Sequence, residues 1–296
     1  MRILRYKSKP DQQPVLAALT DDGKVYDLPA PDLMTLVAQA RSEGITPTVW
    51  IQKRLNSERL RTDNVAELEL AVPVEAPEVW AAGVTYERSR QARNYEATGG
   101  KLDATTFYDK VYDAERPEIF FKSTAARTVG PNDALYLRSD SNWQIPEPEL
   151  GLVLASDGAI VGYTIGNDMS CRDIEGENPL YLPQAKIWRR SCSIGPYVRL
   201  AETVEDPYKF QMSCRIYREG KLVTEGDASI GQLKRKLDEL VSFLKRDNEL
   251  FDGTVLLTGT CIVPPNDFTL QPGDRVEIEI DEIGVLSNSI EAQPAN

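Results

Sequence analysis

The 296-residue chain contains no histidine. This absence excludes a serine–histidine–aspartate triad, a cysteine–histidine pair and any metal site with imidazole ligands. General acid–base chemistry near neutral pH must then fall to glutamate, aspartate, lysine, tyrosine or cysteine side chains with shifted pKa values. Any bound metal is expected to have oxygen ligands and to be a hard divalent cation.

Cysteines and long apolar runs are also scarce. The four cysteines, at 171, 192, 214 and 261, form no close pair, which argues against a zinc knuckle or redox dithiol and predicts buried, reduced thiols. No apolar run approaches membrane-spanning length, and residues 1–13 lack the apolar core of a signal peptide, so we expect a cytoplasmic protein. The net charge of −12 disfavours nucleic acids and anionic membranes as partners.

The distribution of patterns along the chain predicts an α+β fold with two domains. Residues 1–72 are expected to form a small N-terminal α/β domain, with helices over 32–42, capped by Asp32, and over 48–60. A segment with two prolines at 71–80 marks the change to a larger, mainly β C-terminal domain, residues 73–296, which holds the site.

The stretch 145–173 is the most informative part of the chain. Proline at 146 and 148 fixes its own φ and favours extended geometry in the residue before it, so the segment is not expected to be helical. In an extended strand, side chains two positions apart share a face, so Glu147 and Glu149 form a carboxylate pair.

A third carboxylate is expected to join this pair. A turn at 156–158 leads into a second β-rich run that ends at Asp168, and in a hairpin the start of one strand lies beside the end of the next. Glu147, Glu149 and Asp168 therefore converge, which suits Mg²⁺ or Mn²⁺. The alternative is that Glu-x-Glu lies on a solvated strand face, but the apolar run at 150–154 indicates a buried strand, where unpaired charge is costly.

The remaining segments contain several expected elements. A polar helix at 87–97 either covers the surface or supplies substrate contacts through Glu87, Arg88, Ser89 and Arg93. A long irregular connection over 173–198, with Lys186 near its end, is typical of a functional loop. Further predictions are a hairpin at 210–229, a packing helix at 230–248, strands at 252–265 and 274–290, and a close backbone approach to a ligand at 258–260.

Taken together, the motifs at 146–154, 162–186, 258–260 and 272–284 resemble the fumarylacetoacetate hydrolase family. The resemblance covers most of residues 79–284 and implies that family's mixed β-sandwich roll and a homodimer or higher homo-oligomer. It also implies that Glu147, Glu149 and Asp168 hold Mg²⁺ or a similar ion, and that the family's lysine and threonine correspond to Lys186 and Thr260.

One departure narrows this resemblance. Family members that hydrolyse carbon–carbon bonds carry a histidine just after the strand corresponding to 79–86, where this chain has none. The chain is more similar to the branch of 2-keto-3-deoxy sugar acid dehydratases. This similarity implies that Ser89, Glu118 and Lys186 are catalytic residues around the substrate, and we expect the substrate to be bound by Arg88, Arg172 and Thr260.

The chemistry expected of such a site begins with a 2-keto acid chelated to the ion through its carboxylate and keto oxygen, which stabilises an enolate. We favour Lys186 as the base at carbon 3 and Glu118 as the acid at the hydroxyl of carbon 4, and these two roles could be exchanged. Loss of water and tautomerisation convert a 2-keto-3-deoxy pentonate, arabinonate- or xylonate-derived, into 2,5-dioxopentanoate.

Other functions are compatible with the same residues. They are hydrolysis of an acylpyruvate with a carboxylate activating water, decarboxylation of an oxaloacetate-like acid, and metal-dependent binding of a keto acid without turnover. The sequence also leaves open a hexonate-derived substrate, and Mn²⁺ or Ca²⁺ as the ion in place of Mg²⁺.

Overall fold

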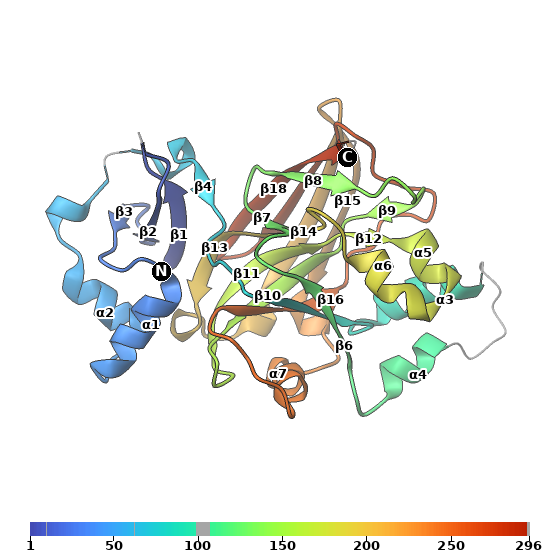
Figure 1. The fold of residues 1–296 in the computed structure, drawn as a ribbon, viewed down its shortest axis with the longest axis horizontal. Helices are drawn as coiled ribbons and strands as arrows, with labels where there is room; N and C mark the ends of the chain where they lie inside the picture. The colour runs from blue at the N-terminus through green and yellow to red at the C-terminus, as the bar shows by residue number, and fades with distance from the viewer. Residues whose placement is uncertain (10, 62, 99–106, 295–296) are drawn as a thin grey trace.

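The computed structural model describes residues 1–9, 11–61, 63–98 and 107–294, and it has the predicted α+β fold (Figure 1). Its largest sheet contains, in spatial order, β3 (Val25–Asp27), β2 (Pro14–Leu19), β1 (Arg2–Lys7), β13 (Cys192–Leu200), β11 (Ile160–Asp168), β10 (Pro148–Leu154), β16 (Thr254–Thr260), β5 (Val79–Gly83) and β6 (Glu118–Ser123). Two short strands extend it, β4 (Leu70–Ala71) on β1 and β7 (Thr128–Val129) on β13.

A second sheet packs against the first. Its spatial order is β15 (Lys221–Ser229), β14 (Gln211–Arg218), β17 (Arg275–Ile280), β18 (Gly284–Ala292) and β8 (Ala134–Leu137), and a separate small sheet pairs β12 (Ser170–Cys171) with β9 (Gln144–Ile145). One hydrophobic cluster joins the two large sheets, with Leu152 and Ile165 from the first and Ile216 and Ile278 from the second. This shared core holds β10 and β11 rigidly in the middle of the molecule.

The N-terminal segment extends the main sheet. β1 pairs with β13, with Arg2 opposite Arg199, so the sheet is continuous between this segment and the rest of the chain, and a domain division after residue 72 stays a prediction. Helix α1 (Leu33–Ser42) is the predicted one, and its first turn is capped by Asp32, which accepts a hydrogen bond from the Thr35 amide at 2.7 Å.

The second N-terminal helix is shorter than predicted. Helix α2 (Pro47–Arg54) ends because Leu55 adopts extended geometry, and the rest of the predicted span contains the 3-10 turn η1 (Ser57–Arg59). Other 3-10 turns are η2 (Val65–Glu67), η4 (Ala201–Thr203) and η5 (Pro207–Lys209).

Three other predictions about local structure were wrong. The helix over 230–248 is a 3-10 turn, η6 (Ile230–Gln232), followed after extended residues by α7 (Leu237–Lys245). The strand at 274–290 is two strands, β17 and β18, joined by a turn in which Glu282 has φ 61°. The irregular connection over 173–198 contains short helices, α5 (Arg172–Glu177), η3 (Pro179–Tyr181) and α6 (Leu182–Lys186), and then β13.

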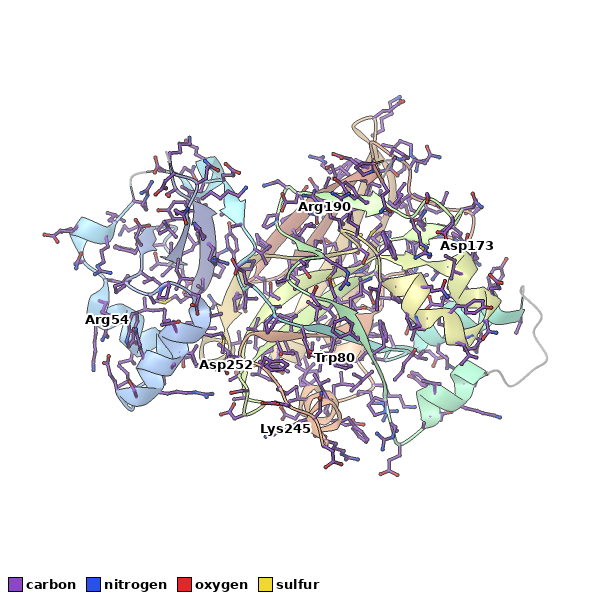
Figure 2. The ribbon with its side chains drawn as sticks, in the orientation of Figure 1. Arg54, Trp80, Asp173, Arg190, Lys245 and Asp252 are labelled. Atoms are coloured by element: carbon purple, nitrogen blue, oxygen red, sulfur yellow. The ribbon has the colours of Figure 1, made fainter. Side chains whose placement is uncertain are left out.

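The helices α5 and α6 gather with α3 (Glu87–Thr98) and α4 (Phe107–Asp113) at one end of the main sheet, on the right of Figure 1. α3 confirms the predicted polar helix. Asp173, labelled on this side in Figure 2, accepts hydrogen bonds from the Ser141 hydroxyl (2.6 Å) and the Asn142 amide (2.7 Å), which anchors the start of α5.

The hairpins predicted at 145–173 and 210–229 are confirmed. All four cysteines are buried and unpaired, as expected. No helix in the described residues is both long and apolar enough to span a membrane.

Candidate metal centre and active site

The β10–β11 hairpin brings three carboxylates together. The Asp168 amide donates a hydrogen bond to the Glu147 carbonyl at 2.9 Å, so the start of one strand lies against the end of the other. One oxygen each from Glu147, Glu149 and Asp168 lies within 4.8 Å of the others, and these residues are only 5%, 1% and 1% exposed. The convergence inferred from the hairpin is therefore present in the structure.

The electrostatics of this cluster favour a bound cation. Burial, followed by the charges of Asp168 and Glu147, raises the pKa of Glu149 well above its ordinary value. Burial also acts to raise the pKa of Glu147, but the Lys186 and Arg93 charges outweigh it and hold that pKa low. Three adjacent, buried oxygen donors without imidazole or thiolate match the ligand preference of Mg²⁺ or Mn²⁺.

The backbone of β16 also contacts the carboxylate cluster. The Gly259 amide donates a hydrogen bond to Glu149 Oε2 at 2.7 Å. Gly259 has φ +98°, and a Cβ there would lie 1.9 Å from Thr85 Oγ1, so only glycine fits. The close approach predicted for 258–260 thus serves a carboxylate of the cluster.

Two buried lysines contact the cluster in different ways. The Lys186 ammonium, at the end of α6, contacts Glu147 and lies 3.4 Å from Asp168 Oδ2. Burial acts to lower the pKa of Lys186, but the charges of Asp168 and Glu147 outweigh it, so the pKa of Lys186 is raised. Lys186 is therefore a charged group in this arrangement of the site.

The other lysine, Lys122 on β6, was not among the predicted site residues. Its ammonium lies 2.6 Å from Asp168 Oδ1 and donates hydrogen bonds to the carbonyls of Met169 (2.8 Å) and Lys186. These three acceptors match the three donors of an ammonium group. The available signal was strand periodicity, because Lys122 shares a face with Glu118 in an otherwise apolar run, where a buried lysine needs an acidic partner.

Glu118 lies at the start of β6, opposite Gly83 of β5. A Cβ at Gly83 would lie 2.0 Å from Glu118 Oε2, so the carboxyl occupies the space that this glycine leaves. Glu118 Oε2 is buried and has no hydrogen-bond partner among the described residues. Burial raises the pKa of Glu118 against the opposing charges of Arg93 and Lys186, which makes it a candidate proton donor.

Helix α3 is held over the carboxylates by two ion pairs that run in opposite directions. Arg93 of α3 contacts Glu175 of α5, and Arg172 of α5 contacts Glu96 of α3, with 2.9 Å between Nε and Oε1. Arg172 was expected to bind substrate. In this structure its ion pair with Glu96 holds α3 against α5. Arg93 was among the possible substrate contacts of the polar helix, and in this structure it pairs with Glu175. Glu96 and Glu175 were not among the predicted site residues, since nothing in the sequence pairs α3 with α5.

The remaining predicted residues lie at the same end of the sheet. The Ser89 hydroxyl is buried and donates to the Tyr86 carbonyl at 2.8 Å. Thr260 lies opposite Glu149 in the β10–β16 ladder, and its hydroxyl donates to the Ile262 carbonyl at 3.1 Å. Arg88 lies on the exposed side of α3 and donates to the Val263 carbonyl at 3.3 Å, so it faces away from the three carboxylates.

This fold and this arrangement of carboxylates and lysine are accompanied by a family match over most of the chain. Residues 89–291 match the family described as fumarylacetoacetate (FAA) hydrolase C-terminal. The chain belongs to the fumarylacetoacetate hydrolase family, as the resemblance implied.

Individual relatives narrow the similarity to one branch. The chain is 46% identical over 279 residues to a probable 2-keto-3-deoxyxylonate dehydratase of Haloferax volcanii. The aligned residues are 91% of this chain and 93% of that protein. It is 46% identical over 227 residues to 2-dehydro-3-deoxy-D-arabinonate dehydratase of Saccharolobus solfataricus, covering 77% and 76%. A solved 2-keto-3-deoxy-D-arabinonate dehydratase complexed with magnesium and 2,5-dioxopentanoate is similar over 100% of both chains, with 35% identity and a TM-score of 0.85.

Proposed function

We propose that the protein is a magnesium-dependent dehydratase that converts a 2-keto-3-deoxy pentonate into 2,5-dioxopentanoate. The observation that carries this proposal is the buried cluster of Glu147, Glu149 and Asp168 with Lys186 in contact with two of its carboxylates. The names of the two relatives at 46% identity support the same reaction.

Glu147, Glu149 and Asp168 are the proposed ligands of Mg²⁺. Their burial and oxygen chemistry fit a hard divalent ion, and the solved relative complexed with magnesium supports this choice. When bound, the ion supplies Lewis-acid stabilisation of the enolate that forms when a 2-keto acid loses a proton from carbon 3.

The protein's own residues move the protons. Lys186 is the proposed base that removes the carbon 3 proton. Its pKa is raised here by the charges of Asp168 and Glu147, and a cation held by these carboxylates would lower it and so release the ammonium proton. Glu118, protonated because burial raises its pKa, gives its proton to the hydroxyl that leaves carbon 4 as water. Transfer of a proton from carbon 5 to carbon 3 then gives an enol across carbons 4 and 5. Transfer of the enol hydroxyl proton to carbon 4 gives the aldehyde of 2,5-dioxopentanoate. Exchange of the two roles between Lys186 and Glu118 is the alternative.

The surrounding residues are proposed to position the substrate. Ser89 and Thr260 lie beside the cluster and carry hydroxyl groups for the substrate's oxygens, and Arg172 positions α3 through Glu96 while adding positive charge near Glu147. Arg88 is proposed as a substrate ligand only if α3 rotates on binding, since its guanidinium contacts Val263 here. An Arg88→Ala variant with unchanged KM contradicts that role.

The decisive experiment is an assay of purified, Mg²⁺-loaded protein against a panel of 3-deoxy-2-keto acids and acylpyruvates, with identification of the products. We expect 2,5-dioxopentanoate from a 3-deoxy-2-keto pentonate. Release of pyruvate from an acylpyruvate without any dehydration supports the alternative, carbon–carbon bond hydrolysis.

We also propose a cytoplasmic location and a homodimer or higher homo-oligomer. The family membership supports the assembly. Light scattering on the eluted protein tests it, and a mass equal to the 33.1 kDa chain contradicts it.

A further inference from the structure

A cavity of about 520 Å³ opens next to Glu118, between α4 and the η3–α6 segment. Its walls are mostly apolar, and they are formed by Val111, Ala114, Pro117, Pro179, Leu180 and Leu182. Volumes of this order accommodate small-molecule ligands. The cavity is therefore large enough for a five- or six-carbon acid.

The inner end of the cavity touches the site. Glu118 and Glu175 line it, the Glu118 Oε2 atom is buried without a hydrogen-bond partner among the described residues, and Glu175 is 1% exposed. Both carboxyl groups interact with Arg93, and the charge of Lys186 also acts on Glu118. The cavity thus ends at the residue proposed to protonate the leaving hydroxyl, next to the proposed base.

The outer part of the cavity is positively charged. Lys110 and Arg116 line it, both are exposed, and neither forms an ion pair within the described residues. Nearby Asp109 and Asp113 are already neutralised by Arg90 and Lys234, each at 2.8 Å. Two positive charges at the mouth of a cavity create a local field that raises the association rate of anions.

We propose that this cavity is the entrance through which a small dianionic or monoanionic 2-keto carboxylate reaches Lys186, and that Lys110 and Arg116 draw the anion in. The apolar walls offer no competing hydrogen bonds, so the anion passes to the charged groups at the inner end. The ligand class rests on the proposed function, whereas the route rests on the cavity and its charges.

The test measures how fast oxalate, an unreactive dianion that chelates hard divalent cations, associates with the Mg²⁺-loaded full-length protein. Stopped-flow fluorescence can follow binding, because Trp188 lies near the site with Lys122 Nζ 5.2 Å from its ring centroid. We expect K110Q/R116Q to reduce the association rate constant about 5- to 20-fold at low salt, and the difference to shrink strongly near 0.5 M salt, as expected for screened steering.

The matched control is K53Q/R127Q. It removes the same charge from two exposed positions, on α2 and between β6 and β7, that do not line the cavity. We expect an association rate within about twofold of the unmodified protein, since distant charges are screened. The steering by Lys110 and Arg116 is overturned if the association rate constant falls equally in both double variants, or if it does not fall in K110Q/R116Q.

A second variant tests the route itself. Ala114→Trp fills the cavity wall, and we expect it to slow both association and dissociation of oxalate while Mg²⁺ affinity, measured by calorimetry, stays unchanged. Unchanged oxalate kinetics in a folded Ala114→Trp protein overturn the entrance. The protein could bind oxalate as expected here and yet dehydrate no 3-deoxy-2-keto acid. That result contradicts the proposed function and leaves the entrance intact.

Discussion

The floor and the cover of the site are built in different ways. The floor consists of β10, β11 and β16, which place the three carboxylates through backbone pairing with a shift of register between Glu149 and Gly151, and of β6, which pairs with β5. The cover, α3 and α5, consists of polar helices that are joined by the ion pairs Arg93–Glu175 and Arg172–Glu96. From this difference we infer that metal binding depends on the paired strands, while enclosure of a substrate depends on charge pairs between helices outside the sheet.

This contrast predicts that floor variants lose metal and chemistry, whereas cover variants lose substrate affinity and stability. A buried ion pair has a large desolvation cost, so it contributes little net stability, but removing one partner leaves a costly unpaired charge. The first four variants below are ordered by the size of their expected effect on the site, and the last tests the pH dependence of stability.

The largest effect is expected for Asp168→Asn. Loss of one of three anionic oxygen donors, in a position where Lys122 and Lys186 remain charged, is expected to weaken Mg²⁺ binding at least about 100-fold and turnover about 10³-fold. Calorimetric titration with Mn²⁺ or Mg²⁺ measures this. Glu225→Gln, an exposed carboxylate on the edge strand β15, is the control, and chelator-stripped wild-type protein that retains full activity contradicts the metal's role.

Lys186→Met separates the chemistry from the metal. We expect turnover to fall about 10³-fold or more, because general acid–base groups contribute factors of this order, while Mg²⁺ affinity stays within about fivefold. Lys186→Arg should not restore turnover, since guanidinium stays protonated near neutral pH. Appreciable turnover in either variant removes Lys186 from the proposed base role.

Lys122→Met tests the second lysine as a positioning residue of the floor. Its side chain is 0% exposed and its ammonium has three acceptors, including Asp168, so its loss removes the contact that fixes the Asp168 carboxylate. Loss of the positive charge alone favours a bound cation, but the misplacement of Asp168 is expected to outweigh it. We expect about 10-fold weaker Mg²⁺ binding and about 3–5 kcal/mol lower unfolding free energy in urea. Weakened stability with unchanged Mg²⁺ affinity would assign Lys122 a purely structural role.

Glu96→Gln tests the cover. Arg172 then loses its buried counter-charge, so we expect KM to rise several-fold and the unfolding free energy to fall by about 2–4 kcal/mol, with Mg²⁺ affinity unchanged. Steady-state kinetics and calorimetry on the same preparation measure both. If Glu96→Gln weakened Mg²⁺ binding as much as Lys122→Met is expected to, the distinction between floor and cover would be contradicted.

Glu118→Gln is expected to have the smallest effect on stability. The effect is a change in how the unfolding free energy depends on pH. Burial raises the folded-state pKa of Glu118 above 4.5, so the folded protein binds more protons than the unfolded chain above that pH. Stability therefore falls as pH rises from about 4.5 towards the folded pKa. In metal-free protein, Glu118→Gln should show a shallower decline in unfolding free energy over this window, and identical slopes contradict a protonated Glu118.

Much of the floor was predictable because it depends on local rules. The prolines at 146 and 148 and the turn at 156–158 set the β10–β11 hairpin, and strand periodicity then brings Glu147, Glu149 and Asp168 together. The Asp32 cap located α1 in the same way. The boundaries of other elements were wrong where residues such as Leu55 and Glu282 adopt backbone angles that no nearby pattern indicates.

The sequence by itself determined the kind of chemistry, since a chain without histidine leaves carboxylates and lysines to bind the ion and move protons. Only the tertiary structure decided which lysine has an acceptor for each of its three ammonium donors, and which arginine pairs with which glutamate. Lys122 meets Met169 across 47 positions of sequence, and Arg93 meets Glu175 from another helix. Such partners are chosen by burial, because a charge removed from water must find its counter-charge wherever the packed elements place it.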